Sequence, residues 1–565
     1  MAARTSSVEQ GAPAQYSGGA AGLRSRVEYW RSQLPETDWV PWAILGLAAF
    51  LRVLLLGMKP PHFDEGINGW FVDQVTHNGF YRYDPTNYHG PLHFYVLLLF
   101  ESLFGRNLWA LRMPVVLVSI ACVWLALKFE PLVGRNIARI AALAMAISPG
   151  FVFYGRYAIH EVWLQFFSTM FILGLLGLWR MGRLNYLWYA GIGLAGMILT
   201  KETYAIHAVC ALLAVPALAV SYALSRVPEA RPAKQIWTWV DLAMVLLVGA
   251  AAVVFFYSGT FFNWSGVKGL YLAFKAWTET GAAGHGHEKP WDYWLKLMGP
   301  SLEFRRSDLL GYELPMLVGL ILCAFCQKLK NLSLRYLAIY GVGSMVVYSY
   351  VKYKTPWCII SFGWPFLFIF GAAVVLVRPK HVRIAYRTIA VVLCISLGSS
   401  IWLNYFRCSS PDEPYAYVQT YNDTFKLTKP LLKLARRDPV YYHLTGHLIR
   451  SSVYPLPWML GDFDRVGYYE GGNMPGNLDG DFLLVQQDKI KDVESKLRDA
   501  YYTDTLTIRN YQDPSKVYFS AKIFKEFYPG KAPDFVGKPP GTDKVPGADK
   551  VPGADKIPDA AKPPG

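Results

Sequence analysis

Long runs of apolar residues alternate with short polar stretches from residue 39 to residue 405. The first run covers about 39–58, which is long enough for one helix to cross a bilayer. Further apolar runs lie near 112–128, 137–153, 162–179, 186–200, 205–225, 236–257, 312–327, 334–350, 361–377 and 387–405. The pattern predicts a mainly α, polytopic helical membrane protein with about 11–13 transmembrane helices.

One further run, 93–104, is short and contains Glu101. At about 1.5 Å per residue it falls short of a ~30 Å hydrocarbon core, so we expect it not to cross. All the basic loops then lie on one side of the membrane. They carry Lys128, Arg135 and Arg139; Arg180 and Arg183; Arg226, Arg231 and Lys234; Lys328, Lys330 and Arg335; and Arg378, Lys380, Arg383 and Arg387. The positive-inside rule predicts that segment 1–38 is cytoplasmic and that everything after 405 is extracytoplasmic, in a protein of the cell membrane.

The segment 409–528 has a different pattern. Short β-type runs alternate with two helical ones, Phe425–Arg437 and Lys489–Ala500, which predicts a small extracytoplasmic α/β domain. The expected strands are Ala416–Tyr421, Val440–Leu444, Phe482–Gln486, Thr505–Ile508 and Val517–Ile523. The tail 529–565 is rich in Pro, Gly, Lys and Asp, repeats Asp-Lys-Val-Pro-Gly-Ala, and is expected to be disordered.

Composition excludes several classes of protein. Hydrophobic residues make up 53% of the 565 residues and charged residues only 17%, which excludes a disordered chain, a coiled coil and an ordinary cytosolic enzyme. The net charge of +15 does not require a nucleic-acid partner, because many Lys and Arg residues lie in the basic loops. Of the seven cysteines, most lie in apolar runs, so neither a disulfide framework nor a zinc site follows.

Charged clusters separated by long apolar runs all map to the outer face of this topology. Charges at a membrane boundary are costly and often functional. The first cluster contains Asp64 and Glu65, the two candidate catalytic acids, and the same loop ends with His89. A partly buried carboxylate there can act as a general base. Alternatively, both acids serve as helix-dipole partners at the start of a surface helix over 63–77.

Two more clusters follow at later helix boundaries. Arg156 can bind a phosphate through two parallel hydrogen bonds, and Glu161 can hold a sugar hydroxyl or a metal ion. The alternative is an Arg–Glu pair that caps adjoining helix ends. Lys201 is a phosphate-binding candidate beside Glu202, and its alternative is a lysine that extends to the membrane interface.

The last two clusters lie in outer loops. His285, His287 and Glu288 are spaced closely enough to bind a divalent ion, although they have no second ligand set; the alternative is a flexible Gly-rich loop. Trp291 follows them as a candidate substrate-binding aromatic. Lys354 lies among Tyr and Trp residues and is either a phosphate contact or part of a belt of interfacial anchors.

Several of these motifs resemble the GT-C superfamily of membrane glycosyltransferases, in particular its protein mannosyltransferase and aminoarabinose transferase type. The similarity covers about residues 40–360. It rests on the Asp64-Glu65 pair, His89-Gly90-Pro91-Leu92, Phe104-Gly105 through Leu111-Arg112-Met113-Pro114, Gly134-Arg135, Ile147-Ser148-Pro149 and Arg156 to Glu161. The loop 285–291 and Thr200-Lys201-Glu202-Thr203-Tyr204 look like a branch first named as archaeal N-glycan flippase-associated proteins.

The resemblance implies a direct-displacement enzyme with a polyprenyl-phosphate-linked sugar as donor and a lipid, glycan or protein acceptor that enters from the outer side. Asp64 takes the family position of the general base, and Glu161 is the best match to the second acidic site. Arg156, Lys201 and Lys354 would then hold the leaving phosphate, and His89, Glu202 and Trp291 would contact substrate. A single displacement predicts inversion at the anomeric carbon. No cofactor is expected with certainty, and a divalent metal ion stays open.

Three alternatives remain. A secondary transporter would place its charges in mid-membrane and would have repeated halves, neither of which the sequence has. A non-catalytic, flippase-associated membrane protein would tolerate neutralisation of Asp64. A polymerase or ligase of surface polysaccharide would still be a glycosyltransferase of similar layout.

Overall fold

The computed structural model describes residues 38–225, 234–299 and 313–537, apart from 88, 285, 471, 472 and 511. Segment 1–37, the tail after 537, Arg226, Arg231 and His285 therefore lie outside the described residues. The helical part consists of α2 (Trp39–Val53), α3 (Phe63–Asn78), α4 (Leu92–Phe104), α5 (Leu108–Lys128), α6 (Glu130–Val133), α7 (Arg135–Ile147), α8 (Pro149–Tyr154), α9 (Glu161–Met181), α10 (Leu184–Ile198), α11 (Tyr204–Ser225), α12 (Trp239–Tyr257), α13 (Ser265–Ala283), α14 (Tyr293–Met298), α15 (Leu314–Cys323), α16 (Leu332–Tyr350), α17 (Ile359–Gly371), α18 (Ala373–Leu376) and α19 (Val382–Ile401).

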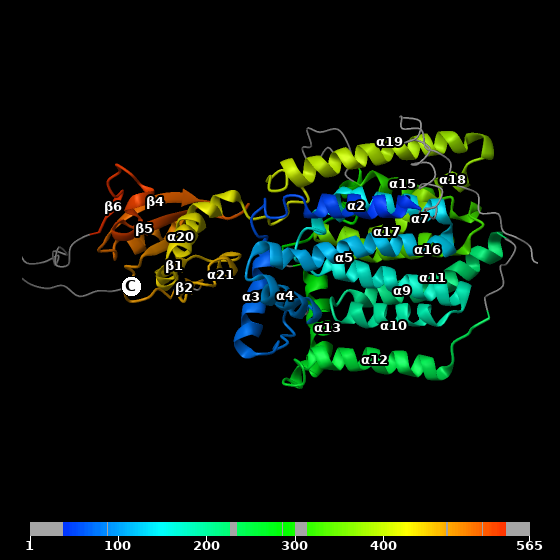
Figure 1. Cartoon of the computed structure of the whole chain (residues 1–565), viewed down its shortest axis with the longest axis horizontal. Coiled ribbons are helices and arrows are strands. Elements are labelled where there is room, and N and C mark those ends of the chain that lie inside the picture. Colours follow the sequence, from blue (N-terminus) through cyan, green and yellow to red (C-terminus); the bar gives the residue numbers. More distant parts are fainter. Residues whose placement is uncertain are drawn as a thin grey trace, which may run out of the picture.

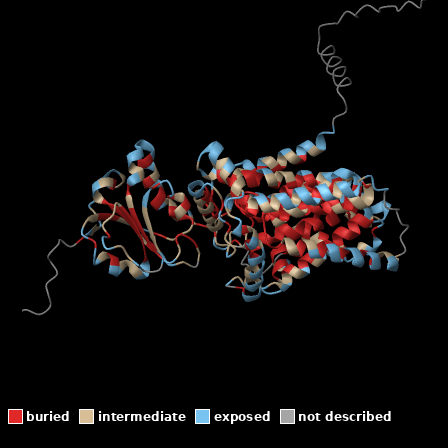
Figure 2. Ribbon diagram, turned by 90° about the horizontal axis from the view of Figure 1, so that it is seen from below, coloured by how far each residue is buried: buried red, intermediate tan, exposed pale blue. Residues whose placement is uncertain are grey.

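The bundle of helices is that of an integral membrane protein. Five segments within the described ranges have the length and apolarity of a complete crossing: 108–133, 161–181, 204–225, 239–257 and 379–406. Four shorter apolar helices accompany them, among them α2 and α4. Buried residues gather inside the bundle and exposed ones lie on its outside (Figure 2). Along the apolar helix α12 only Val245 and Tyr257 are buried, so most of its side chains face outward. Such a surface suits lipid rather than water.

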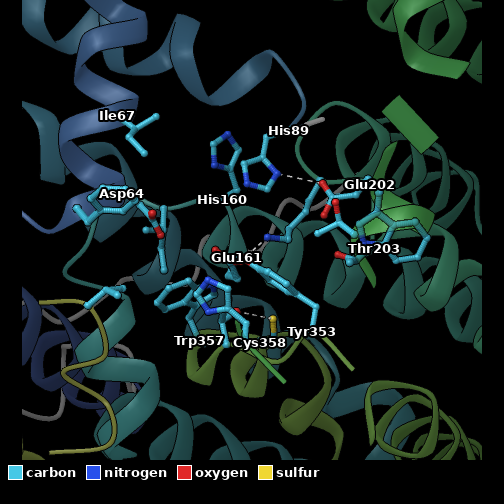
Figure 3. Close-up of a pocket in the computed structure, with 18 of the residues that line it drawn as sticks. Asp64, Ile67, His89, His160, Glu161, Glu202, Thr203, Tyr353, Trp357 and Cys358 are labelled. Carbon is cyan, nitrogen blue, oxygen red and sulfur yellow. Dashed lines mark hydrogen bonds and ion pairs between the residues drawn. The ribbon is translucent and has the colours of Figure 1, made fainter. Parts of the chain in front are cut away.

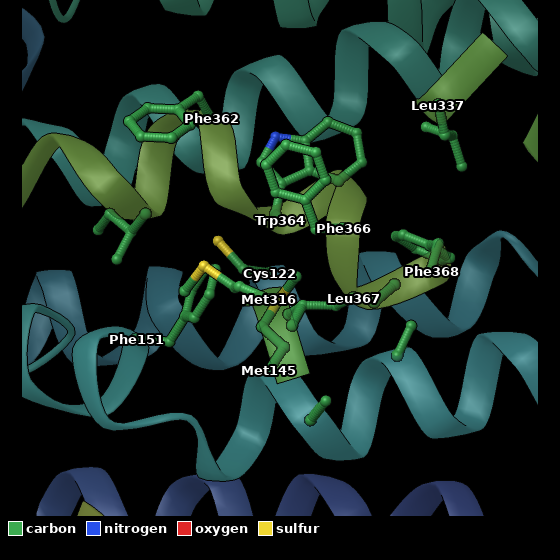
Figure 4. Packing of buried hydrophobic residues seen from close by; sticks show 14 of the residues in the cluster. Cys122, Met145, Phe151, Met316, Leu337, Phe362, Trp364, Phe366, Leu367 and Phe368 are labelled. Carbon is green, nitrogen blue, oxygen red and sulfur yellow. The ribbon is translucent and has the colours of Figure 1, made fainter. Parts of the chain in front are cut away.

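The core of the bundle surrounds α17. Every residue of this helix is buried, as expected for a helix that is apolar on all sides. It packs against α7, α15 and α16, and the rings of Phe362, Trp364, Phe366 and Phe368 fill the space between them (Figure 4). Glycine permits the closest approach, because a Cβ at Gly319 of α15 would lie 1.9 Å from the Phe366 carbonyl oxygen.

The C-terminal domain contains one six-stranded mixed sheet with the order β2-β1-β3-β5-β4-β6. Its strands are β1 (Thr445–Ile449), β2 (Arg465–Tyr469), β3 (Phe482–Gln486), β4 (Ala500–Leu506), β5 (Ser515–Ser520) and β6 (Phe535–Val536), and its short helices are α21 (Leu456–Met459), α22 (Ile490–Glu494) and α23 (Ala521–Phe524). Strand β3 pairs with β1 in parallel and with β5 in antiparallel orientation, with Leu484 opposite Leu448 and Val517. Helix α20 (Phe425–Arg437) covers one face through Leu427, Leu431 and Leu434.

The predictions for this domain were right for α20 and β3 and shifted or wrong elsewhere. The expected strand at 440–444 is a 3₁₀ turn, because Asp438 caps the Val440 N–H at 2.9 Å and Pro439 starts the turn; β1 begins only at Thr445. The expected helix at 489–500 ends at Glu494. The segment 416–421 forms no strand and contributes only an isolated bridge between Thr420 and Arg509.

The two parts meet along α3 and α4, which lie at the end of the bundle that faces the C-terminal domain (Figure 1). Helix α21 packs on α3, where Gly69 leaves room for the indole of Trp458; a Cβ there would lie 2.2 Å from the ring. Arg106 binds Asp73 of α3 through two hydrogen bonds of 2.9 and 3.0 Å and also donates to the Trp458 carbonyl oxygen. This contact holds the domain against α3.

Candidate active site

A cavity of about 470 Å³ lies where the helix bundle meets the C-terminal domain (Figure 3). Its wall comes from α3, the loop before α4, the start of α9, the α10–α11 loop, α13, the α16–α17 loop and the loop between β4 and β5. Of the residues singled out from the sequence, Asp64, His89, Glu161, Lys201, Glu202 and His287 line this cavity. Segments far apart along the chain therefore share one site.

Asp64 lies in the first turn of α3, and one third of its side chain (33%) is exposed. The Nδ1 atom of His62 accepts the Asp64 backbone N–H at 3.1 Å and thereby caps the helix. The helix dipole stabilises the carboxylate at this position. Because its side chain remains open to the cavity, Asp64 can also accept a proton from a bound hydroxyl.

Glu65 requires a correction, because it cannot act in the cavity as a second catalytic acid. Its side chain is fully buried and binds Arg112 in a bidentate pair with distances of 2.6 and 2.8 Å. It also accepts the backbone N–H groups of His62 at 2.8 Å and Ala158 at 2.9 Å. Both carboxylate oxygens of Glu65 are thus used in bonds that hold α3 and the segment before α9 in place. Glu65 therefore has a structural role.

A buried cluster of charged side chains forms the inner wall of the cavity. Lys201 donates to Glu161, and His89 lies 3.0 Å from a Glu202 oxygen (Figure 3). Burial opposes the charge on Lys201, but the Glu161 and Glu202 carboxylates outweigh it and raise the pKa of this ammonium. Burial likewise opposes the charge on Glu202, yet His89 and Lys201 hold its pKa below the ordinary value. The Lys201 and Glu202 charges therefore stabilise each other inside the cavity wall.

His160 is a cavity residue to which the sequence analysis assigned no role. Its ring lies 4.6 Å from the His89 ring and 4.3 Å from the His93 ring, between centroids. Burial lowers the pKa of His160 well below its ordinary value, so the ring is neutral at physiological pH. Its Nε2 atom has no hydrogen-bond partner among the described residues. The only sequence signal for it was its position next to Glu161.

Two of the expected phosphate-binding cations do not reach the cavity, which corrects their assignment. The buried Arg156 guanidinium donates to the carbonyl oxygens of Leu51 at 3.0 Å and Leu55 at 2.9 Å and lies over the Tyr405 ring. It satisfies the open carbonyls at the end of α2. The Lys354 ammonium donates to the carbonyl oxygens of Val351 at 2.5 Å and Lys289 at 3.0 Å. Arg156 and Lys354 therefore each bind nearby main-chain carbonyl oxygens.

The loop around residues 285–291 contributes one side chain to the cavity. His287 lines it and is hydrogen bonded to the Tyr417 hydroxyl at 2.6 Å. Glu288 does not line the cavity; it accepts the Gly286 N–H at 3.2 Å and forms an isolated β-bridge with Tyr353, which does line it. Trp291 is 71% exposed and is not among the residues that line the cavity. His285 lies outside the described residues, and no group of three or more His, Cys, Asp or Glu side chains in the described part could hold a metal ion.

A second, apolar cavity of about 200 Å³ lies beside α10 and α12. Gly191, Gly196 and Gly249 form its floor together with aliphatic and aromatic side chains. One of its lining residues, Leu199, lies two residues before Lys201 in the sequence.

Comparison with known proteins relates this architecture to established families. Residues 88–256 match the family model described as dolichyl-phosphate-mannose-protein mannosyltransferase. No curated protein gave a significant match.

Solved structures match nearly the whole chain. The structure of ArnT from Cupriavidus metallidurans bound to undecaprenyl phosphate aligns with a TM-score of 0.59 at 13% identity, over 86% of this chain and 98% of that one. Its apo form aligns with a TM-score of 0.53 at 13% identity, over 88% and 98%. An Archaeoglobus fulgidus oligosaccharyltransferase with a tethered acceptor peptide aligns with a TM-score of 0.47 at 13% identity, over 84% and 74%. The chain therefore has the fold of the GT-C membrane glycosyltransferases, and its residues 88–256 carry the pattern of the protein mannosyltransferases.

Proposed function

We propose that this chain is an integral-membrane glycosyltransferase that moves a sugar from a polyprenyl-phosphate-linked donor to a hydroxyl group of an acceptor. The observation that carries the proposal is the cavity, in which the open carboxylate of Asp64 faces a site also lined by Lys201, Glu161 and Glu202. The likeness to ArnT, solved with undecaprenyl phosphate, and the mannosyltransferase pattern support it.

The reaction is a single displacement at the anomeric carbon. Asp64 accepts the proton of the acceptor hydroxyl while the hydroxyl oxygen forms the new bond to that carbon. The bond between the carbon and the phosphate oxygen breaks, and the phosphate leaves with the electron pair. Because attack and departure occur on opposite faces, the anomeric configuration inverts. The acceptor gains the sugar, and the lipid phosphate is released.

The apolar cavity beside α10 and α12 offers a path for the isoprenoid chain of the donor. Its aliphatic lining matches a hydrocarbon chain, and its outward neighbours on α12 are exposed apolar side chains. Leu199 lines it and precedes Lys201 by two residues, so a chain lying in it would place its phosphate toward the Lys201 cluster. The donor then enters from the membrane and the acceptor from the other end of the cavity.

We assign the cavity to the extracytoplasmic face. Support comes from the basic loops, several of which touch one another. Asn331 donates to the Leu132 carbonyl oxygen at 2.8 Å, Asn136 to the Tyr386 hydroxyl at 3.0 Å, and the Ile236 N–H to the Gly182 carbonyl oxygen at 2.9 Å. These contacts gather positive loops at one face, which the positive-inside rule assigns to the cytoplasm.

The proposal is tested by transfer of a radiolabelled sugar from a polyprenyl phosphate to lipid, glycan or protein acceptors by the purified protein. Asp64→Asn removes the base and is expected to lower turnover by a factor on the order of 10²–10⁴. Asp488→Asn, which changes an exposed carboxylate of the C-terminal domain, serves as the matched control. Equal turnover of Asp64→Asn and wild type would exclude the base role, whereas no transfer by wild type with any donor and acceptor would favour a non-catalytic, flippase-associated protein.

A divalent metal ion is tested in the same assay. The rate is measured after EDTA treatment and again after Mg²⁺ or Mn²⁺ is restored. Loss and recovery of turnover would implicate a metal ion, and His287→Ala and Glu288→Gln would then show whether this loop binds it.

A further inference from the structure

The C-terminal domain contributes one cation, Arg509, to the wall of the cavity. The residue follows β4, and its main chain is fixed by the bridge to Thr420 and by a 2.7 Å hydrogen bond from the Tyr421 N–H to the Ile508 carbonyl oxygen. Segment 416–421 connects the bundle with the domain, so Arg509 is anchored to the membrane part as well as to the sheet.

Among the described residues, no carboxylate forms an ion pair with the Arg509 guanidinium. It lies 3.9 Å from the ring centre of Phe63, the residue before Asp64, and its Nη2 donates to the Ser452 hydroxyl at 2.9 Å. The residue is 92% buried, with 8% exposed, and its Nη1 has no hydrogen-bond partner among the described residues. Burial lowers the pKa of Arg509 to about 10, with Asp64 acting to raise it, so the group is charged at physiological pH.

The other cation that lines the described part of the cavity is already neutralised. Lys201 is ion-paired with Glu161, and Glu202 lies beside it. Among the described lining residues, the carboxylates of Asp64, Glu161 and Glu202 stand against the cations of Lys201 and Arg509, and His89 pairs with Glu202. A phosphate entering it meets net repulsion unless an unpaired donor receives it. A buried, charged donor without a partner is costly, and an anion that accepts from it removes this cost.

We infer that Arg509 binds a phosphate group of the substrate, so that the C-terminal domain completes the active site of the proposed enzyme. This inference rests on the proposed function for the identity of the substrate. Arg509 lies over the ring of Phe63, the residue before Asp64, and the guanidinium and the Asp64 carboxylate both line the cavity and act on each other electrostatically. Two sources supply such a phosphate: the lipid-linked donor, or an anionic acceptor.

The test measures binding to the purified full-length protein and does not require turnover. The probes are undecaprenyl monophosphate in detergent micelles, the same polyprenol without phosphate, and glycerol 1-phosphate in solution. Arg509→Gln is expected to weaken binding of a phosphate probe about tenfold or more, because a hydrogen bond to a charged group is lost. Arg509→Lys is expected to retain part of the affinity, and the polyprenol should bind all forms equally.

Arg437→Gln is the matched control, since Arg437 lies on the exposed surface of the same domain and pairs with Glu526. A loss confined to the lipid phosphate assigns Arg509 to the donor, and a loss confined to glycerol 1-phosphate assigns it to the acceptor. Unchanged affinity for both probes in folded Arg509→Gln and Arg509→Lys would overturn the inference. Failure of the proposed function is a separate result, because wild-type protein would then bind phosphate probes and transfer no sugar.

Discussion

Neighbouring carboxylates in this protein have opposite environments. Asp64 is open to the cavity at the start of α3, whereas Glu65 points into the protein toward Arg112. Successive positions on a helix are rotated by about 100°, so two adjacent acids face different surroundings. One side chain is therefore available for chemistry while the other fixes the helix that presents it.

Glu65→Gln is expected to destabilise the protein rather than to affect catalysis alone. It leaves the fully buried Arg112 without its carboxylate, and breaking a buried pair costs about 3–5 kcal/mol. Thermal unfolding in detergent measures the effect. Glu130→Gln removes an exposed pair with Arg135 and should change the stability by less than about 1 kcal/mol. A melting temperature of Glu65→Gln equal to wild type would contradict the structural role.

The sequence identified the right clusters but could not separate their members. Asp64, His89, Glu161, Lys201 and Glu202 were predicted and line the cavity. Arg156 and Lys354 are cations near helix ends, as Lys201 is, yet they bind backbone carbonyl oxygens. Which cation faces a cavity depends on the direction of its side chain, and no spacing rule supplies that.

At the scale of elements, a backbone contact positions the inner wall of the cavity. The Gly90 N–H donates to the Thr200 carbonyl oxygen and the Leu92 N–H to the Leu199 carbonyl oxygen, each at 3.1 Å. This pairing joins the loop before α4 to the loop between α10 and α11. It holds His89 within hydrogen-bond distance of Glu202.

Gly90→Ala is expected to separate these two loops. A Cβ at this position would lie 2.2 Å from the Leu199 carbonyl oxygen and 2.6 Å from the Thr200 nitrogen, and neither backbone atom can move independently. A displacement of about 1 Å in a catalytic site lowers the rate by up to roughly a hundredfold. The sugar-transfer rate measures the loss, with a thermal melt to confirm folding. Gly343→Ala on α16, where a Cβ meets no atom within 4 Å, should leave the rate unchanged, and equal rates for both variants would refute the argument.

Helices and strands with a clear hydrophobic periodicity were predictable from the sequence. Elements that depend on a local capping hydrogen bond were not. The apolar runs gave the bundle helices, and the spacing of Leu427, Leu431 and Leu434 gave α20. The 3₁₀ turn before β1 depends on one Asp438 hydrogen bond, which outweighs the β propensity of Val440 and the two tyrosines after it. A hydrophobic pattern does not reveal such a single capping hydrogen bond.

At the scale of the molecule, the position of the C-terminal domain could not be predicted. The sequence placed it on the same side as the cavity but did not show that it forms part of the wall. That arrangement depends on tertiary contacts, such as Trp458 against Gly69 and Arg509 over Phe63, whose partners lie in different domains. Because these contacts involve identified side chains, the docking of the domain on the bundle can be tested by mutation.

The contact between α4 and α21 makes this attachment dependent on pH. The Trp458 indole N–H donates to Glu101 at 3.3 Å, and Arg106, Asp73 and Asp462 are the other charged groups that face this carboxyl. Burial raises the pKa of Glu101 from 4.5 to about 7, against the opposing effect of Arg106. Glu101 therefore ionises less readily when the C-terminal domain is docked on α4 than when the domain is undocked and Glu101 is exposed.

The sign of the effect follows from this raised pKa. Below pH 4.5 Glu101 is protonated both when the domain is docked and when it is not, so its titration does not affect docking. Between pH 4.5 and 7 the docked state loses stability. Above about pH 7 the loss is complete and is on the order of 3 kcal/mol. Hydrogen exchange of Leu456–Met459 should therefore be faster at pH 8 than at pH 5 once corrected for the intrinsic rates. Glu101→Gln cannot ionise and should abolish the difference, whereas Glu526→Gln on the exposed surface should preserve it. An equal pH dependence in wild type and Glu101→Gln would show that another group controls the docking of the domain.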